Sequence, residues 1–154
     1  MTIPVAVLIS GSGTNLQAIL DACEQPSFGA HIAIVISNRK NAYGLQRAAE
    51  KGVQTKWVPH RSRSREEFEE ELISVLKFHK VEWILLAGFM RVLTAKFLSA
   101  FHHRVLNIHP SLLPSFPGMN AQQQALDYGV KRTGATVHFV DAGMDTGPII
   151  LQDS

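Results

Sequence analysis

Short apolar runs alternate with segments of helical periodicity along this chain, and this alternation constrains the fold more than any other feature. The first run, residues 5–9, is continuously apolar, which is typical of a parallel strand buried on both faces. Apolar residues then recur every three or four positions, and this spacing predicts a helix. Repeated strand–helix alternation produces βαβ units. We therefore expect an α/β fold with a three-layer, open, twisted, mostly parallel sheet and helices on both faces.

The same patterns give approximate bounds for each element. Strands are predicted at residues 5–9, 32–36, 55–58, 83–86, 105–108, 135–140 and 147–152. Helices are predicted at residues 15–24, 43–51, 65–80, 94–101 and 121–128. Ser64, with Glu67 three positions later, predicts a capping box at the start of the third helix. A chain of 154 residues can bury one core, so we expect residues 1–154 to be a single domain.

Charge and cysteine content narrow the range of partners. The net charge is +2, and the basic cluster Arg61, Arg63 and Arg65 is followed by five glutamates in residues 66–71. Nucleic-acid surfaces need an unopposed basic face, so nucleic acid is not an expected partner. No apolar run approaches the length of a membrane span, and the N-terminus reads as a strand instead of a signal peptide. With a single cysteine, Cys23, the chain is expected in the cytoplasm.

The stretch VLNIHPSLLPSFPG, residues 105–118, carries the most chemistry. Asn107 and His109 lie two positions apart on a predicted strand, so their side chains share a face. Pro110 ends the strand because it cannot donate to a ladder. Three prolines and Gly118 stiffen the following loop, and Leu113–Pro114 is a candidate cis peptide. Two interpretations have equal weight: a small site for acyl-type chemistry, or polar side chains that satisfy backbone groups at a strand end.

Glycines between the first strand and the first helix suggest an anion site. The sequence SGSGTN, residues 10–15, lets the backbone approach a ligand, and a helix N-terminus favours a phosphate. It is neither a full G-x-G-x-x-G motif nor a P-loop, so a single phosphate is favoured over a dinucleotide or a triphosphate. The alternative is a tight turn in which Ser or Thr caps the helix.

Two aspartates follow the sixth predicted strand. A carboxylate beside His109 would hold one tautomer and stabilise the imidazolium, but the spacing does not choose between Asp141 and Asp145. Asp145 also begins a tight turn that ends in Gly-Pro, which is the alternative role for it. His138 lies within the sixth strand, where a hydrogen-bonded sheet residue is favoured over a ligand.

Several kinds of catalytic site are missing from the sequence. There is no Gly-x-Ser-x-Gly elbow, and Cys23 lies inside a predicted helix, so a protein nucleophile is not indicated. The histidines form no helical pair with a glutamate, so no metal site is expected. A histidine and an asparagine without a nucleophile fit a transfer between two bound substrates.

Five motifs together resemble one enzyme family. ISGSGTNLQAI, SNRKNAYGLQRA, LAGFMRVL, LNIHPSLLPSFPG and GATVHFVDAGMDTGPIILQ occur in the order and spacing of the phosphoribosylglycinamide formyltransferases, over essentially the whole chain. The resemblance implies a Rossmann-like fold. It also implies transfer of the formyl group of 10-formyltetrahydrofolate to the amine of 5′-phosphoribosylglycinamide (glycinamide ribonucleotide), a step of de novo purine biosynthesis.

The resemblance also implies site residues. The catalytic residues would be Asn107, His109 and Asp145, and the substrate phosphate would bind at Gly13, Thr14 and Asn15. The folate would contact Arg65, Met90, Arg91, Val92, Leu93, Asn107, Asp141, Ala142, Gly143, Met144 and Asp145.

Two departures from the family pattern keep other readings open. The sequence ends at Ser154, where family members continue through another strand and a long helix, and Asn120 stands where members commonly carry a histidine. The alternatives are a formyltetrahydrofolate hydrolase, another folate-dependent formyltransferase, or an inactive fragment or binding module. An unfinished sheet would expose an edge, so a homodimer is compatible with the sequence.

Overall fold

The computed structural model describes residues 1–154, and the chain forms two compact units. The first unit is Met1–Arg91 and the second unit is Val92–Ser154. No helix in either unit has the length and apolar character needed to cross a bilayer.

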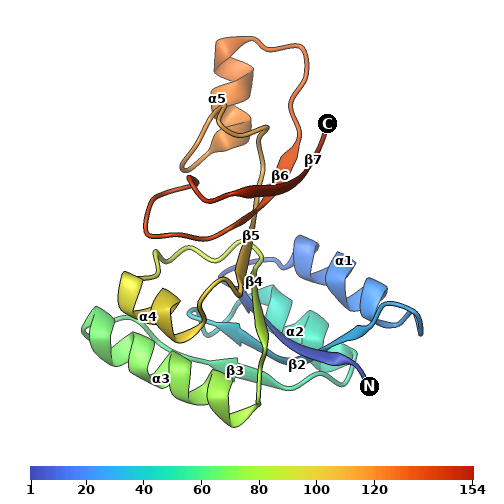
Figure 1. The fold of residues 1–154 in the computed structure, drawn as a ribbon, viewed down its shortest axis with the longest axis vertical. Coiled ribbons are helices and arrows are strands. Elements are labelled where there is room, and N and C mark those ends of the chain that lie inside the picture. Colours follow the sequence, from blue (N-terminus) through green and yellow to red (C-terminus); the bar gives the residue numbers. More distant parts are fainter. The chain divides into compact units, whose positions relative to one another are not determined.

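The first unit contains a parallel sheet (Figure 1). Its strands lie in the order β3-β2-β1-β4, with β1 at Ile3–Ile9, β2 at Ala30–Ser37, β3 at Thr55–Trp57 and β4 at Trp83–Leu86. The predicted strands are confirmed, and two begin earlier than the apolar runs because Ile3 and Ala30 already pair with each other. Parallel pairing aligns the carboxyl ends of these strands, so the turns that follow them lie at one edge of this sheet.

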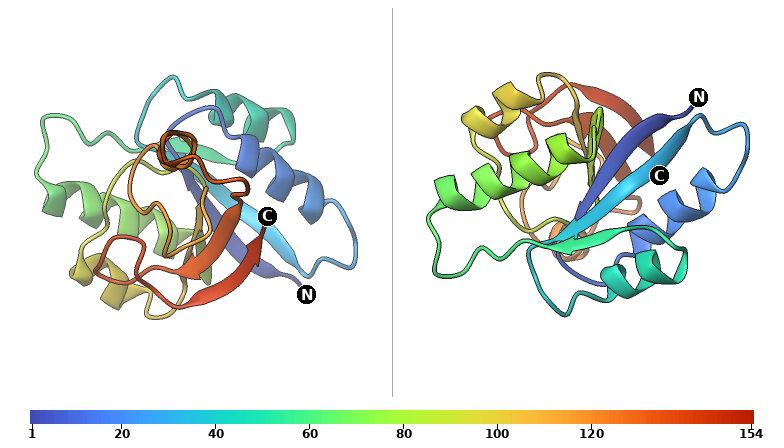
Figure 2. Two further views of the ribbon diagram at one scale, coloured as in Figure 1. Left: turned by 90° about the horizontal axis from the view of Figure 1, so that it is seen from above. Right: turned by 90° about the horizontal axis from the view of Figure 1, so that it is seen from below.

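Three helices cover this sheet on both faces (Figure 2). Helices α1 (Thr14–Cys23) and α2 (Tyr43–Glu50) lie on one face, and α3 (Arg65–Phe78) lies on the other. Alternate residues of β1 explain this layering, because successive side chains of a strand point to opposite faces. The core between β1, β2, α1 and α2 is formed by Val5, Val7, Ile9, Leu16, Leu20, Ile32, Val35 and Ala48. In this unit the layered arrangement predicted from the sequence is confirmed.

The capping box predicted at the start of α3 is present. Ser64 Oγ accepts a hydrogen bond from the Glu67 N–H at 3.0 Å, and Glu67 Oε1 accepts one from the Ser64 N–H at 3.1 Å. The hydrogen bond from the Ser64 backbone N–H to the Glu67 carboxylate is the main cause that lowers the pKa of this carboxyl. The box fixes the start of α3 at Arg65, the residue at which the helix was expected to begin.

The second unit is built differently from the predicted crossovers. It contains α4 (Ala95–Ala100), β5 (Val105–His109), α5 (Ala121–Tyr128), β6 (Ala135–Phe139) and β7 (Ile149–Asp153). The β5–β6 and β6–β7 pairs are antiparallel, so the expected βαβ crossover from β5 to β6 is wrong. A parallel crossover requires its helix to pack across the sheet, whereas α5 stands beyond the end of β5 (Figure 1).

The proline-rich loop after β5 is tied to β6. The Leu113–Pro114 peptide bond is cis, as the sequence suggested. The Thr136 hydroxyl, fully buried, donates to the Ser111 carbonyl at 2.7 Å and accepts from the Leu113 N–H at 3.1 Å. Ser111 Oγ in turn donates to the Ser115 carbonyl. These bonds hold the loop immediately after His109 in one shape.

Candidate functional site

The end of β5 presents two polar side chains on one face of the antiparallel pair. Asn107 lies opposite His138 and His109 lies opposite Thr136 in the register. His109 and His138 are both buried, with 4% and 2% of their surface exposed. Buried imidazoles need hydrogen-bond partners, so their contacts indicate what each ring does.

His109 contacts an acceptor at each ring nitrogen. Its Nε2 lies 2.9 Å from the Phe116 carbonyl oxygen, and its Nδ1 lies 3.4 Å from Asp145 Oδ2. A carbonyl oxygen only accepts, so Nε2 carries a proton. The Asp145 carboxylate faces the other nitrogen, so the ring is held from both sides. His109 thus satisfies a backbone group, as one interpretation held, and also pairs with an acid.

Asp145 is the aspartate that reaches His109. Its Oδ2 accepts the Gly118 N–H at 2.7 Å, and its Oδ1 lies 3.7 Å from His138 Nε2. The backbone of Asp145 has a φ of 55°, a left-handed conformation that Asp tolerates better than most residues. Asp141 instead accepts from the Gly143 N–H and the Thr146 hydroxyl within its own loop. The choice that the spacing left open therefore falls on Asp145.

His138 is the member of this cluster whose role the sequence analysis missed. Its Nδ1 lies 2.9 Å from the Phe139 carbonyl oxygen, so Nδ1 is the protonated nitrogen of the neutral ring. Its Nε2 lies 3.4 Å from Asn107 Nδ2, an amide nitrogen that only donates. His138 is a hydrogen-bonded sheet residue, as predicted, but it also orients Asn107. The signal in the sequence was that both residues are polar in otherwise apolar strands. We call Asn107, His109, His138 and Asp145 the acid–base cluster.

The loop residue that contacts His109 has an unusual backbone. Phe116 has a φ of 51°, which is rare for a bulky side chain and costs about 1–3 kcal/mol. Its ring packs edge-to-face on Tyr128 of α5, with 5.8 Å between centroids. The carbonyl of a strained residue therefore accepts the Nε2 proton of His109.

In the first unit, the N-terminus of α1 is open to a ligand. The helix begins after Gly13, which has a φ of 76°, and no side chain caps it, so the predicted alternative of a Ser or Thr cap is wrong. A hollow of about 270 Å³ lies there, lined by residues 10–15 together with Arg39, Ala87, Gly88 and Met90. Uncapped N–H groups and a nearby guanidinium suit an anion.

Helix α2 holds this glycine loop in place. The Gly44 N–H donates to the Gly11 carbonyl at 3.1 Å, and Arg47 Nε donates to the Ser12 carbonyl at 2.7 Å. Gly13 lies so close to Gly44 that a Cβ on Gly13 would lie 2.7 Å from the Gly44 Cα. Because two groups of α2 bind carbonyls of the loop, the orientation of the peptide groups in the loop is fixed.

The positions expected to contact a folate are mostly accessible. Met90, Val92 and Met144 have 54%, 55% and 59% of their surface exposed, which is high for apolar side chains. Arg65, Ala142 and Gly143 are exposed and Arg91 is partly exposed, whereas Leu93 is 5% exposed. Leu93 is therefore better placed to pack against its neighbours than to contact a ligand.

Two further sequence expectations concern single positions. Asn120 adopts a left-handed conformation with a φ of 56° just before α5, and its side chain makes no capping bond. No group of three or more His, Cys, Asp or Glu side chains is arranged to hold a metal ion.

Comparisons with known proteins identify the family to which the chain belongs. A family model described as "Formyl transferase" matches residues 3–154. Phosphoribosylglycinamide formyltransferase of Escherichia coli (strain K12) is 44% identical over 149 residues, which cover 96% of this chain and 70% of that protein. The trifunctional purine biosynthetic protein adenosine-3 of Drosophila melanogaster is 51% identical over 151 residues. This chain spans 11% of the length of the Drosophila protein.

Solved structures give the same result. Glycinamide ribonucleotide transformylase 1 from Symbiobacterium toebii superposes with a TM-score of 0.96 and 52% identity, over 99% of this chain and 72% of that one. Phosphoribosylglycinamide formyltransferase from Brucella melitensis superposes with a TM-score of 0.94 and 40% identity, over 99% of this chain and 79% of that one. These matches confirm the resemblance seen in the motifs and the α/β fold class.

Proposed function

Because the chain belongs to the formyl transferase family, we propose that it transfers a formyl group from 10-formyltetrahydrofolate to the amine of 5′-phosphoribosylglycinamide. The observation that carries the proposal is the contact of Asp145 with His109, beside the oriented carboxamide of Asn107. Acid–base chemistry without a protein nucleophile suits a reaction in which one substrate supplies the attacking atom.

We assign to Asn107 and His109 the stabilisation of the negative charge that develops during the reaction. As the amine attacks the formyl carbon, negative charge grows on the formyl oxygen, and N–H donors aimed at that oxygen stabilise it. One N–H of Asn107 is engaged by His138, which leaves the other for the oxygen. One such donor contributes about 2.7–4 kcal/mol in a water-excluded site.

His109 is assigned the proton transfer. The proton to be transferred is the one on Nε2, which is hydrogen-bonded to the Phe116 carbonyl, because the Nδ1 side of the ring faces Asp145. General acid catalysis of this kind contributes about 10²–10⁴-fold. Asp145 acts as a positioning residue that holds the ring in orientation, and its own orientation is fixed by the Gly118 N–H.

The first unit supplies the proposed phosphate site. Thr14 and Asn15 begin α1 without a side-chain cap, and Gly13 gives the backbone its left-handed turn. These are the residues proposed to hold the phosphate of the glycinamide substrate. For a flat, largely aromatic donor, the first unit offers the exposed apolar side chain of Met90, and the second unit offers those of Val92 and Met144. Arg65 of the first unit is exposed and suits carboxylates.

A formyl-transfer assay tests the proposal. The chain is incubated with 10-formyltetrahydrofolate, with or without 5′-phosphoribosylglycinamide, and the formylated amine and free formate are measured separately. Product that depends on the amine supports the proposal. Formate released at the same rate without the amine would indicate a hydrolase. Binding of both substrates without turnover would indicate a binding module.

The domain organisation of the chain and the compartment in which it acts are also proposals. Residues 1–154 are proposed to belong to one formyltransferase domain that acts in the cytoplasm on small molecules. A homodimer stays a prediction, and sedimentation of the purified chain at several concentrations tests it. One feature bears on it: three apolar side chains of β7 are exposed, Ile149, Ile150 and Leu151, at 49%, 48% and 63%.

A further inference from the structure

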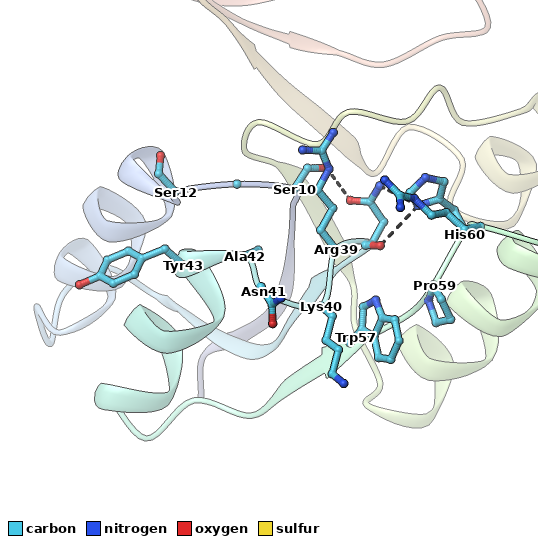
Figure 3. A pocket seen from close by; sticks show the side chains of 13 residues that line it. Ser10, Ser12, Arg39, Lys40, Asn41, Ala42, Tyr43, Trp57, Pro59 and His60 are labelled. Carbon is cyan, nitrogen blue, oxygen red and sulfur yellow. Dashed lines mark hydrogen bonds between the residues drawn. The ribbon is translucent and has the colours of Figure 1, made fainter.

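A second and larger cavity lies in the first unit, beside the glycine loop (Figure 3). Its volume is about 610 Å³. Residues 10–12 of the glycine loop form one wall, and residues 38–43, Trp57 at the end of β3 and residues 59–61 form the rest. Beyond the glycine loop, only Arg39 also borders the proposed phosphate site. The cavity is large enough for a ligand of nucleotide size.

The cavity carries unopposed positive charge. Arg39, Lys40 and Arg61 line it, no Asp or Glu does, and none of the three side chains pairs with a carboxylate. Two other cations of the same unit are neutralised: Lys51 contacts Glu24 at 2.6 Å, and Arg63 contacts Glu71 at 3.4 Å. Cations left unpaired around a concave surface attract an anion.

The inner wall of the cavity is a run of hydrogen bonds. The Met90 N–H donates to Ser10 Oγ at 2.8 Å, and the Ser10 hydroxyl donates to Asn38 Oδ1 at 2.5 Å. His60 Nδ1 lies 3.2 Å from Asn38 Nδ2 and 3.4 Å from the Asn38 carbonyl oxygen. Ser10 and Asn38 are 2% and 4% exposed, so these two side chains are buried behind the cavity. His60 itself lines the cavity.

Aromatic surface completes the lining. Trp57 is 42% exposed, and Lys40 Nζ lies 5.6 Å from its ring centroid; Figure 3 shows the lysine extending beside the indole. An exposed indole next to a cation favours a planar, electron-rich group together with a negative one. We propose that this cavity is a second binding site that takes a nucleoside monophosphate, with its phosphate at Arg39 and Arg61 and its base at Trp57.

Arg39 lines both this cavity and the smaller hollow at the N-terminus of α1. Two phosphates bound at once would therefore compete for one guanidinium. Occupation of the cavity by a nucleotide should weaken phosphate binding at the glycine loop, and the reverse should hold equally because coupling between sites is reciprocal.

Adenosine 5′-monophosphate, titrated calorimetrically into the full chain, is the probe. Arg61→Ala and Trp57→Leu should each weaken its binding by about tenfold or more, because each removes a charge-assisted bond or a stacking surface. Lys56→Ala is the matched control, since this neighbouring lysine on β3 does not line the cavity, and it should bind as the parent does. Adenosine, ribose 5-phosphate and tri-γ-glutamate should each bind more weakly than the nucleotide.

A fluorescence readout places the ligand independently. The chain has two tryptophans, so Trp83→Phe leaves Trp57 as the reporter, and the nucleotide should change its emission. The proposal is overturned if the nucleotide does not bind, or if Arg61→Ala and Trp57→Leu leave its affinity unchanged. It is also overturned if only Asn15→Ala abolishes binding, or if tri-γ-glutamate binds more tightly. These outcomes do not depend on formyl transfer, so the proposed function stands or fails separately.

Discussion

Asn107 and His138 face each other across the antiparallel strands β5 and β6, with Asn107 Nδ2 3.4 Å from His138 Nε2. Because His138 Nδ1 donates to the Phe139 carbonyl, Nε2 is the ring nitrogen left to accept the Asn107 N–H. The imidazole therefore sets which way the carboxamide of Asn107 points. His138 on β6 thus orients the N–H donor of Asn107 on β5.

Removing that acceptor should misdirect Asn107. His138→Phe keeps a ring of similar size in a buried position but leaves the Asn107 donor unpaired. We expect the rate of formyl transfer to fall by at most about 10²–10³-fold, the loss that follows complete removal of one oxyanion donor. His138→Gln retains an acceptor and should recover part of the loss. Equal losses in the two variants, measured as kcat at saturating substrates, would remove the orienting role.

His109→Ala should reduce the chemical step at least about a hundredfold, because it removes the proton donor and one donor to the oxygen. Folate binding should change little, since the ring is buried and its contacts are with Phe116 and Asp145. Single-turnover formyl transfer and an equilibrium folate titration measure the two effects. A loss below fivefold would contradict the assignment.

Asp145→Asn should slow formyl transfer. The substitution keeps shape and suits the left-handed backbone, but it removes the carboxylate beside His109 Nδ1. Because the ring then loses a partner that holds it in place for proton transfer, kcat should fall by about tenfold or more. Asp127→Asn on α5, where the side chain bonds only Gln123, is the control and should leave kcat unchanged. A kcat equal to that of the parent would remove Asp145 from the site.

The glycine contact at the phosphate loop should be sensitive to a single methyl group. A Cβ at Gly13 would meet the backbone of Gly44, and its φ of 76° disfavours any side chain. Gly13→Ala should therefore raise KM for the phosphorylated substrate more than it lowers kcat. Gly29→Ala is the matched control, because Gly29 also has a positive φ but open space around it. Similar changes in KM for both variants would argue against a specific role for the loop.

The capping box of α3 gives a prediction for stability. Ser64→Ala removes a cap and should lower the free energy of unfolding by about 1 kcal/mol, measured by urea denaturation. The folded-state pKa of Glu67 is lowered, chiefly by the bond from the Ser64 backbone. Its contribution is therefore present above the unfolded pKa of about 4.3 and is lost as the pH falls through the lower folded value. Glu67→Gln should flatten the dependence of the unfolding free energy on pH in acid. An unchanged slope would exclude a contribution of Glu67 to the acid dependence of stability.

Much of the fold could be predicted from the sequence. Continuous apolar runs located β1, β2 and β4, and the Ser64–Glu67 pattern located the start of α3, because these signals are local. The direction of β6 could not be predicted in the same way. A helix lies between β5 and β6, and only its position beyond the strand end, which depends on packing, makes the pair antiparallel.

The candidate site divides along the same line. Asn107 and His109 stand out because they are polar residues two positions apart in an apolar strand. Their partners are tertiary: Asp145 reaches His109 through a loop of left-handed geometry, and His138 meets Asn107 through a cross-strand register. Spacing alone carries neither fact. The family resemblance named Asp145 but left His138 unnoticed.

The left-handed backbone at Asp145 also limits how this position can change over time. Asn, Asp and Gly adopt such a conformation at little cost, whereas Glu, which has the same charge, does not. Few residues other than Asp fit this backbone conformation at position 145, and those that do lack the carboxylate. Any evolutionary route from this scaffold to a reaction with a different proton donor would have to pass through asparagine or glycine here, or remodel the whole β6–β7 connection first.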